Sequence, residues 1–587
     1  MNDLGHRLTA AFDSPSVRHA TWLGPERTPL SAVIDTPAGG LCRGAVVVCP
    51  PIGKEHVDAY RALVALAQKF ATKGLLVVRF DYRGTGDSAG EQDDPAAVTG
   101  WLDSIVAAVE YVRAAGIEEI TLLGLRVGAL LAARAAAACG PVHSMVLWDP
   151  VVHGRGYLRR SGSLYRLAVS EETGDGRVSI VGAVLHPDAA HALSDLDMRR
   201  IRRTQPFPVL MGVRDTEIGR ADVQHVIGEW DAEHVVVHEY DLFLEPTDFA
   251  VRIPFADLDT IATWVSAHHG RRWCVPALQL RDSAVVGHAD DGTAVVETFC
   301  RIGPHRLFAI RTQSAIDTHS STFTPRPTLV LHATAAEHRI GPVRLWVDTA
   351  RTLARYGVDS VRFDRRGAGD TGIVPDGEHT TLYTDESKED ALAVAEVAAH
   401  TGPAVHVGMC SGGWHAAYAA LHHETRSVVM INMLDWALVR RVAVRQATLA
   451  ASTDHSTVTA MVWRVLHRHA DTVKAALRVA VPYPGWMWLA RRGLLQVPEV
   501  LLSALHRRGV DTTVLLSPDD YAAFVDNHGT ESVDRLRRRG WTGEIRTYPA
   551  GDHSLYSTGL REQVGQDLIA RIVQTVGIRA EVQAESR

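Results

Sequence analysis

The sequence lacks the features that mark membrane, secreted and nucleic-acid-binding proteins. No stretch approaches the roughly 18 uninterrupted apolar residues of a membrane-spanning helix, and the N-terminus has no apolar segment of the kind found in secretory signals. The 61 lysines and arginines are outnumbered by 68 aspartates and glutamates, and the net charge of -7 offers no basic field to nucleic acid or anionic lipid. We therefore expect a cytoplasmic protein that binds neither nucleic acid nor membranes.

Cysteine pairs and cofactor motifs are also missing. The six cysteines form no C-x-x-C pair and no Cys/His cluster at metal-ligand spacing, which is typical of a reduced intracellular protein. They are Cys42, Cys49, Cys139, Cys274, Cys300 and Cys410. The phosphate-binding pattern G-x-x-x-x-G-K-[ST] does not occur, and the glycines at 84–86 and 367–369 belong to turns. We expect neither a metal nor a cofactor.

The chain is long and repeats itself. Its 587 residues are about four times a typical domain, and 46% hydrophobic and 22% charged residues are ordinary for a globular protein. The segment RFDYRGTGDS at 79–88 recurs as RFDRRGAGDT at 362–371, with seven identical positions. Two shorter landmarks recur at nearly the same offset, Glu-His at 55–56 and 337–338, and GLRVG at 124–128 as GMCSG at 408–412. These repeats predict two tandem domains, 1–270 and 271–587, divided near the His-Gly-Arg-Arg stretch.

Apolar runs alternate with amphipathic segments in both halves, which predicts an α/β fold. Runs of valine and leucine without polar alternation are typical of strands covered on both faces, as in a mostly parallel sheet flanked by helices. The predicted strands are 44–50, 74–81, 119–124 and 144–149 in the first half, and 328–333, 359–364, 404–408 and 427–432 in the second. Helical insertions at about 152–205 and 437–508 interrupt this alternation, and we expect them to form caps.

The segment 408–412, Gly-Met-Cys-Ser-Gly, follows a predicted strand and precedes a predicted helix. A G-x-nucleophile-x-G turn of this kind leaves its middle side chain exposed at the helix N-terminus. This spacing selects Cys410 as the nucleophile over Ser411, since Ser411 would place Met409 where the turn has room only for glycine. The positive end of the helix dipole favours the thiolate form of such a cysteine.

A base and an acid follow in the order nucleophile, acid, base. His553 lies in a Gly-Asp-His turn before the final amphipathic segment, and we expect it to act as the base. For the acid we prefer Asp520 to Asp519, because the first half has a G-x-x-D pattern ending at Asp215 after its matching strand. Asp435, just past the preceding strand, is a weaker candidate.

At these residues, both halves resemble α/β-hydrolase domains, and the resemblance covers about 20–575. The elbow, the R-F-D-x-R-G-x-G-D turn, the acid position and the terminal Asp-His carry it. The cysteine is similar to the nucleophiles of dienelactone hydrolases and of some thioesterase domains. The resemblance also implies an oxyanion hole made by the backbone N–H of Ser411 and by that of Ala333 or Thr334.

The first half departs from this pattern. Its elbow carries Arg126, which stays protonated and cannot be a nucleophile or a base, and Leu242 stands where the second half has its histidine. Of the triad positions only Asp215 remains. We expect Arg126 to be neutralised by a carboxylate such as Asp215 or by a bound anion, and the first half to be a pseudo-hydrolase.

These observations predict an acyl-transfer enzyme with a Cys-His-Asp triad in its second half. The expected substrate is a small-molecule or carrier-bound ester or thioester, and homo-oligomers are compatible with the sequence. Two alternatives stay open at this point. One is a peptidase or carboxylester hydrolase, and the other is a non-catalytic scaffold in which Cys410 is inert.

Overall fold

The computed structural model describes residues 16–169, 176–203, 205–244, 251–315, 327–380, 382–438 and 481–577. The chain separates into two compact units that interleave along the sequence. Unit 1 comprises Met1–Arg326, Ala336–Thr380 and Ser554–Arg587, and unit 2 comprises Pro327–Ala335 and Thr381–His553. These units do not divide the chain at 270/271, so the boundary between the two repeats stays a prediction about the sequence.

Within its described residues, unit 1 contains an eight-stranded sheet in the order β1-β2-β4-β3-β5-β6-β9-β10. The strands are β1 (Ser16–Leu23), β2 (Leu30–Pro37), β3 (Ala45–Cys49), β4 (Leu76–Phe80), β5 (Ile120–Leu125), β6 (Ser144–Trp148), β9 (Val209–Arg214) and β10 (Glu233–Val237). Strands β1 and β2 are antiparallel to their neighbours, and the six strands from β4 to β10 run parallel.

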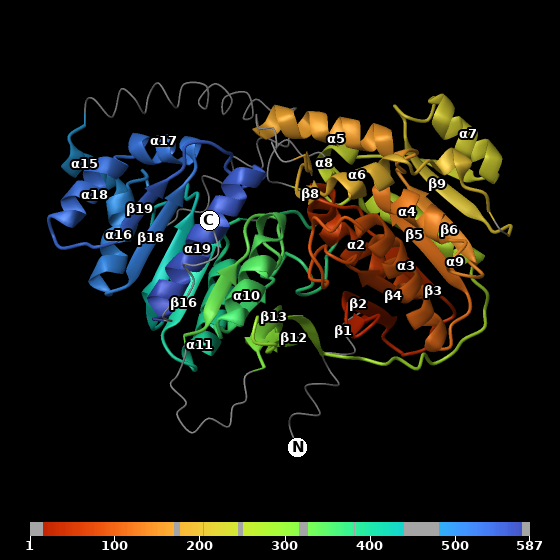
Figure 1. Cartoon of the computed structure of the whole chain (residues 1–587), viewed down its shortest axis with the longest axis horizontal. Helices are drawn as coiled ribbons and strands as arrows, with labels where there is room; N and C mark the ends of the chain where they lie inside the picture. The colour runs from red at the N-terminus through yellow and green to blue at the C-terminus, as the bar shows by residue number, and fades with distance from the viewer. Residues whose placement is uncertain are drawn as a thin grey trace, which may run out of the picture. The chain divides into compact units, whose positions relative to one another are not determined.

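Helices cover both faces of this sheet, as the uninterrupted apolar runs predict. They are α2 (Lys54–Thr72), α3 (Ala97–Ala114), α4 (Val127–Ala135) and α9 (Phe255–His268). On β3, Val47 packs in the cluster formed with α3 and α4, and its neighbours Val46 and Val48 pack in the cluster formed with α2 and α9. Figure 1 shows α2, α3 and α4 around the central strands. When both faces of a strand are buried, apolar and polar residues do not alternate along its sequence.

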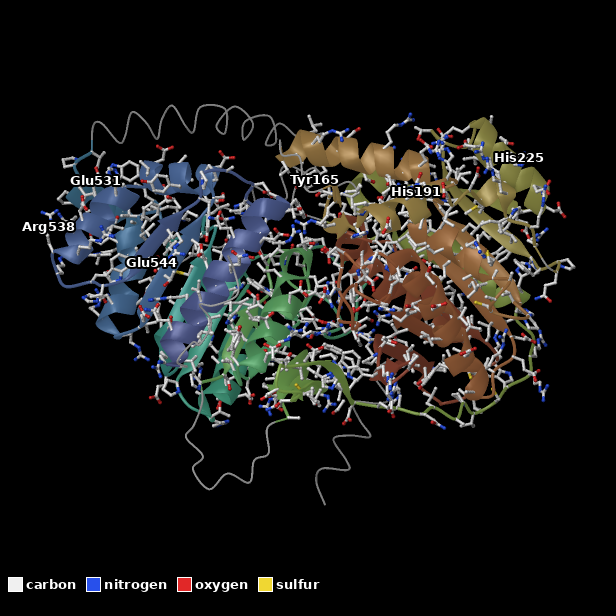
Figure 2. All side chains as sticks on the ribbon, viewed as in Figure 1. Tyr165, His191, His225, Glu531, Arg538 and Glu544 are labelled. Atoms are coloured by element: carbon white, nitrogen blue, oxygen red, sulfur yellow. The ribbon has the colours of Figure 1, made fainter. Side chains whose placement is uncertain are left out.

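The predicted first cap, 152–205, is a set of short elements after β6. It contains α5 (Gly154–Val169), β7 (Val178–Ile180), β8 (Ala183–Leu185), α6 (Pro187–Ser194) and the 3-10 turn η1 (Met198–Arg200). After β9 come α7 (Ala221–Trp230) and α8 (Tyr240–Phe243). Tyr165 on α5, labelled in Figure 2, is buried, and its hydroxyl accepts a hydrogen bond from the Thr558 N–H.

Unit 1 also contains parts of the second repeat. Strands β11 (Ser283–His288), β12 (Ala294–Ile302), β13 (Leu307–Ser314) and β15 (Ser360–Phe363) pair in this order and are antiparallel. The elements η2 (Pro342–Arg344), α10 (Leu345–Arg355) and α19 (Thr558–Val576) complete this part. Helix α10 packs against β13, β15 and α19.

The two repeated turns, 79–88 and 362–371, have the same local structure. In each turn, the first aspartate accepts a hydrogen bond from the backbone N–H of the second, at 2.9 Å in one turn and 2.8 Å in the other. The aspartates are Asp81 and Asp87 in the first turn and Asp364 and Asp370 in the second. The glycine before the second aspartate has a φ of 50° in both turns. A Cβ on this glycine would lie 2.1 Å from the carboxyl carbon of the first aspartate of the same turn. The turn therefore requires glycine.

Buried ion pairs connect these two turns inside unit 1. Arg79 pairs with Asp370 of the other turn at 2.7 Å, and Arg362 pairs with Asp87 in return. Arg339 lies 2.7 Å from Asp87 and 3.2 Å from Asp370. Burial alone would raise the pKa of Asp87, but Arg339 and Arg362 outweigh it and hold that pKa below its ordinary value.

Unit 2 is built on parallel strands in the order β14-β16-β17-β18-β19. The strands are β14 (Leu329–His332), β16 (Ala404–Met409), β17 (Thr425–Ile431), β18 (Asp511–Leu516) and β19 (Glu544–Thr547). The helices are α11 (Asp385–Ala399), α12 (Ser411–His422), α15 (Tyr483–Arg491), α16 (Pro498–Arg507), α17 (Pro518–Asp526) and α18 (Gly529–Arg537). Most of the predicted second cap, 437–508, lies outside the described residues.

The predicted strands of both halves are found within one or two residues of their expected ends, whereas the sequence reasoning did not specify β1, β2 or β11 to β13. Among helices in the described part of the chain, none is long and apolar enough to cross a membrane.

Candidate active site

Cys410 lies in unit 2 at a sharp turn between β16 and α12. Its φ of 48° and ψ of -117° are uncommon for a residue with a side chain, and such strain often marks a functional position. A Cβ on Gly408 would lie 2.2 Å from the carbonyl oxygen of Gly412, and one on Gly412 would lie 2.7 Å from that of His332. Glycine is therefore needed on both sides of Cys410. The cysteine itself is partly exposed, as a reactive thiol requires.

The expected base and acid lie together in the same unit. His553 follows β19, and its Nδ1 is 2.8 Å from Oδ1 of Asp520 on α17. The carboxyl group of Asp520 is buried and also accepts a hydrogen bond from the hydroxyl of Ser517, whereas Asp519 is exposed. The carboxylate can thus orient the imidazole ring, while the catalytic role of Asp520 stays a prediction.

Cys410 contributes to the electrostatics of this pair. Burial alone would lower the pKa of His553, but the interactions with Asp520 and Cys410 raise it to about 10. This shift favours the imidazolium form of His553. A protonated histidine beside a cysteine stabilises the thiolate, which is the nucleophilic form.

The residues expected to form the oxyanion hole lie next to the elbow. Ser411, Ala333 and Thr334 are all buried. The Ser411 hydroxyl accepts a hydrogen bond from the N–H of Ala335 at 3.1 Å and lies 3.2 Å from the Thr334 hydroxyl. These contacts hold the loop after β14 against the start of α12, while the role of the three backbone N–H groups stays a prediction.

Asn432 is a residue of this site that the sequence reasoning missed. Its side-chain amide donates to the carbonyl oxygen of His553 at 2.7 Å, and its side-chain oxygen accepts from the N–H of Ser517 at 2.8 Å. Asn432 thereby ties the loop of the base to the loop of the acid. Its repeat counterpart Asp149 lies 283 positions earlier, and both have a positive φ, 48° and 42°. Comparison of the two halves could have revealed this position.

The elbow of the first half keeps the turn but changes its chemistry. Arg126 has a φ of 56° and ψ of -122°, close to the values of Cys410. Its Nε is 2.9 Å from Oε1 of Glu55, and its Nη1 is 3.2 Å from Oδ2 of Asp149. Burial alone would lower the pKa of Arg126, but Glu55, Tyr240 and Asp149 outweigh it and raise that pKa.

The expectation that Asp215 neutralises Arg126 is wrong. Asp215 lies just after the end of β9 and is exposed. Asp149, directly after β6, has a positive φ. Its side chain forms ion pairs with both Arg126 and Arg214. Leu242 lies in α8. A cavity of about 430 Å³ adjoins Arg126 and includes Arg159 and Arg160 of α5 in its lining, so the first half retains a small-molecule-sized space at its elbow.

Replacing Arg126 by serine is not expected to create a second active site. The new hydroxyl would occupy a nucleophile position, but Leu242 supplies no base, and Glu55 and Asp149 would lose their cation. The measurement is labelling of Cys410→Ala/Arg126→Ser by a fluorophosphonate, read by intact-protein mass spectrometry with Cys410→Ala as the control. An adduct on residue 126 would contradict this account of the first half.

The chain was compared with known families and structures. A family model described as serine aminopeptidase, S33, matches residues 42–173, a segment of the first half that includes the Arg126 elbow. Comparison with curated proteins gives no match. The family match, the strand order and the elbows support an α/β-hydrolase-type fold.

Solved structures match at low identity. They include Est1E from Butyrivibrio proteoclasticus with ferulic acid, at 18% identity and a TM-score of 0.32, covering 42% of this chain and 97% of that one. An esterase from Pyrococcus furiosus matches at 14% identity and a TM-score of 0.33, covering 43% and 92%. A proline iminopeptidase-related protein from Thermus thermophilus matches at 18% and 0.32, covering 43% and 98%.

Proposed function

We propose that the chain is an acyl-transfer enzyme that forms an acyl-Cys intermediate on an ester or thioester. The observation that carries this proposal is the strained elbow that presents Cys410, in the same unit as a histidine, His553, that is hydrogen-bonded to the buried carboxylate of Asp520. A buried inert cysteine would need neither the strained backbone nor a histidine oriented by a carboxylate. The positions of all three residues in the sequence order of the fold add independent support.

The first half-reaction transfers the acyl group to sulfur. The Cys410 thiolate attacks the carbonyl carbon, and the carbonyl electron pair moves to oxygen, where the N–H groups of Ser411 and of Ala333 or Thr334 would stabilise the negative charge. When the tetrahedral intermediate collapses, the bond to the leaving group breaks. The His553 imidazolium donates its proton to the departing alkoxide or thiolate, and a neutral imidazole and a thioester remain.

The second half-reaction releases the acyl group. Water or another acceptor attacks the thioester carbonyl while His553 accepts the acceptor's proton, and the Cys410 thiolate departs. Asp520 keeps the imidazole in the orientation that both proton transfers need. Because thioesters react comparatively well with amines, a cysteine mildly favours transfer over simple hydrolysis.

The direct test is mass spectrometry of the intact protein after incubation with a panel of acyl thioesters and aryl esters. We expect a mass increase equal to one acyl group, located on Cys410 by peptide mapping and lost in Cys410→Ala. Cys300→Ala removes another partly buried cysteine and is the matched control. Acylation that persists in Cys410→Ala, or no acylation by any member of the panel, would contradict the proposal.

A peptidase is the second candidate, because the matching family model is described as a serine aminopeptidase. That match covers the half whose elbow carries Arg126, so it bears on the fold of the first half and not on the chemistry of Cys410. Release of aminoacyl naphthylamides by the wild type, but not by Cys410→Ala, would favour the peptidase over the ester or thioester enzyme.

We also propose that the two halves arose by duplication and that the first is a pseudo-hydrolase. The repeated turns share their hydrogen bonds and glycine conformation, and the two elbows share their backbone angles. In the first half, Arg126 is held by two carboxylates, which is compatible with a structural role.

The imidazolium of His553 is expected to accelerate the alkylation of Cys410. We expect iodoacetamide to alkylate Cys410 at pH 6.5 roughly tenfold faster in the wild type than in His553→Gln. The cation is present below the raised pKa and is lost as the pH passes through about 10, so the difference should close there. Equal rates at pH 6.5 would show that Cys410 is an inert thiol, which is the prediction of the scaffold alternative.

A further inference from the structure

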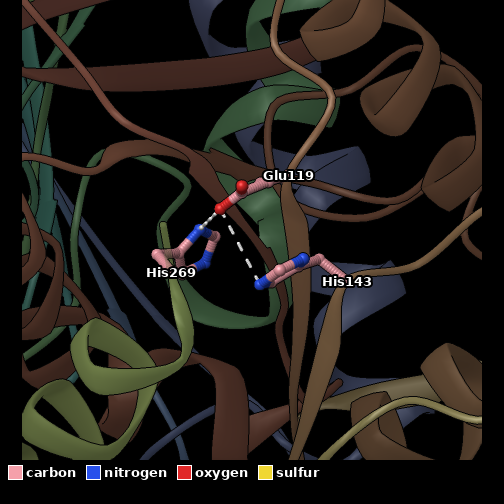
Figure 3. Close-up of side chains that lie close together, drawn as sticks. All are labelled: Glu119, His143 and His269. Atoms are coloured by element: carbon pink, nitrogen blue, oxygen red, sulfur yellow. Dashed lines mark ion pairs between the residues drawn. The ribbon is translucent and has the colours of Figure 1, made fainter. Parts of the chain in front are cut away.

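Glu119, His143 and His269 meet at the amino edge of the sheet in unit 1. Glu119 directly precedes β5, and His143 directly precedes β6, the parallel neighbour of β5. His269 follows the last residue of α9. Figure 3 shows the two imidazole rings directed towards the same carboxyl group. The Arg126 elbow lies at the opposite, carboxyl end of β5, so this cluster is separate from that site.

The ligand atoms of the cluster lie slightly farther apart than those of a tetrahedral metal site. Nδ1 of His269 is 3.5 Å and Nε2 of His143 is 3.8 Å from Oε2 of Glu119, and one ligand atom from each residue lies within 4.8 Å of the others. Zinc binds nitrogen and oxygen at about 2.0–2.1 Å, so tetrahedral geometry separates its ligand atoms by about 3.3 Å. Binding would draw these atoms together, by up to about 1.5 Å for the widest separation.

His269 provides the second observation that points to a ligand. Its side chain is fully buried, and its Nδ1 has no hydrogen-bond partner, which is costly for a buried polar atom. Nε2 lies 2.8 Å from the hydroxyl of Thr121, which in turn lies 2.6 Å from that of Ser144. Thr121 can donate to Ser144 and accept from the Nε2–H of His269, so Nδ1 keeps its lone pair for a cation. Metal-binding histidines are commonly oriented by a hydrogen bond of this kind.

The surrounding backbone keeps space at this nitrogen and orients the carboxylate. A Cβ on Gly44 would lie 2.1 Å from Nδ1 of His269. The N–H of Gly270 donates to Oε2 of Glu119 at 2.8 Å. The nearby cation Arg43 is hydrogen-bonded to the carbonyl oxygens of Ser266, His269 and Gly270.

His143 would change its partner on binding. Its Nε2 lies 2.6 Å from the carbonyl oxygen of His268, and this nitrogen would exchange that hydrogen bond for a metal bond. The side chains of Glu119 and His143 are 34% and 29% exposed, which gives an ion access from solvent.

We propose that Glu119, His143 and His269 bind one zinc ion, with a fourth position open to water. The two nitrogen ligands favour zinc over magnesium or calcium, which prefer oxygen ligands. Because the ligands connect the starts of two sheet strands with the end of α9, the bound ion stabilises the first half of the chain.

The test uses the full chain after removal of metals by a chelator. Titration with zinc chloride should give one bound ion per chain by elemental analysis and raise the melting temperature by roughly 5 °C at a hundredfold excess over Kd. Cobalt(II) should give the intense visible absorption of a tetrahedral complex. Magnesium chloride should produce neither binding nor a shift.

Variants separate this site from adventitious binding. His143→Ala and Glu119→Gln change partly exposed residues, and each should reduce zinc affinity at least tenfold. His225→Ala removes an exposed histidine on α7, labelled in Figure 2, and should leave binding unchanged. Absence of zinc binding in the wild type, or equal binding by wild type and His143→Ala, would overturn the proposal. An octahedral cobalt spectrum would overturn its geometry.

Discussion

Turnover is expected to fall at least roughly a hundredfold when Cys410 is replaced by alanine, while the melting temperature stays close to that of the wild type. The sulfur atom is the proposed site of covalent attachment, and loss of a nucleophile removes both half-reactions. Alanine has a Cβ like cysteine and meets the same backbone strain at φ 48°, so the elbow itself should persist. The measurement is the steady-state rate on whichever ester or thioester acylates the wild type.

Two comparisons make this result interpretable. Cys300→Ala should retain full activity, because Cys300 lies on β12 in unit 1, whereas the proposed array lies in unit 2. Cys410→Ser keeps a small nucleophile at the elbow and should retain a measurable fraction of activity. Activity above about one hundredth of wild type in Cys410→Ala would place the nucleophile elsewhere.

Replacing Asp87 by alanine should destabilise the protein by about 3–5 kcal/mol, the cost of breaking a buried ion pair from one side. The carboxylate is fully buried, and Arg339 and Arg362 would lose an anion with no water to replace it. The prediction concerns the loss of one partner. It does not require the intact network to be more stabilising than apolar residues of the same volume.

Urea denaturation followed by circular dichroism measures this effect. Asp215→Ala is the control, because it removes an exposed aspartate from the same unit and should change the free energy of unfolding by less than about 0.5 kcal/mol. A second variant, Arg362→Met, removes the opposite charge and should also destabilise. A loss below about 1 kcal/mol in Asp87→Ala would mean that water reaches the two arginines.

The parallel strands could be predicted from sequence because burial on both faces leaves an uninterrupted apolar run, as in Ala45–Cys49. The antiparallel strands β11 and β12 are half-buried, and their residues alternate only weakly between apolar and polar, so no comparable run marks them. The elbow at Cys410 was recognisable because local backbone geometry requires glycine at fixed spacing.

Contacts between residues that are far apart in the sequence could not be predicted from these local patterns. Glu55, at the start of α2, pairs with Arg126. The order of strands and acidic residues along the sequence gave no reason to prefer Glu55 to Asp215 as the partner of Arg126. The cluster of Glu119, His143 and His269 lacks the close spacing of metal motifs and is assembled by the pairing of β5 with β6. Asp520, which the sequence favoured as the acid, lies against His553 because its position depends on the short turn after one strand.

The ion pairs between the two repeated turns are reciprocal. Arg79 holds the aspartate of the other turn and Arg362 holds Asp87 in return, which is the reciprocity of an isologous contact between identical subunits. If the repeat is a duplication, an ancestral single-domain protein could have used this turn to form a homodimer. Joining the copies end to end would make that association independent of dilution.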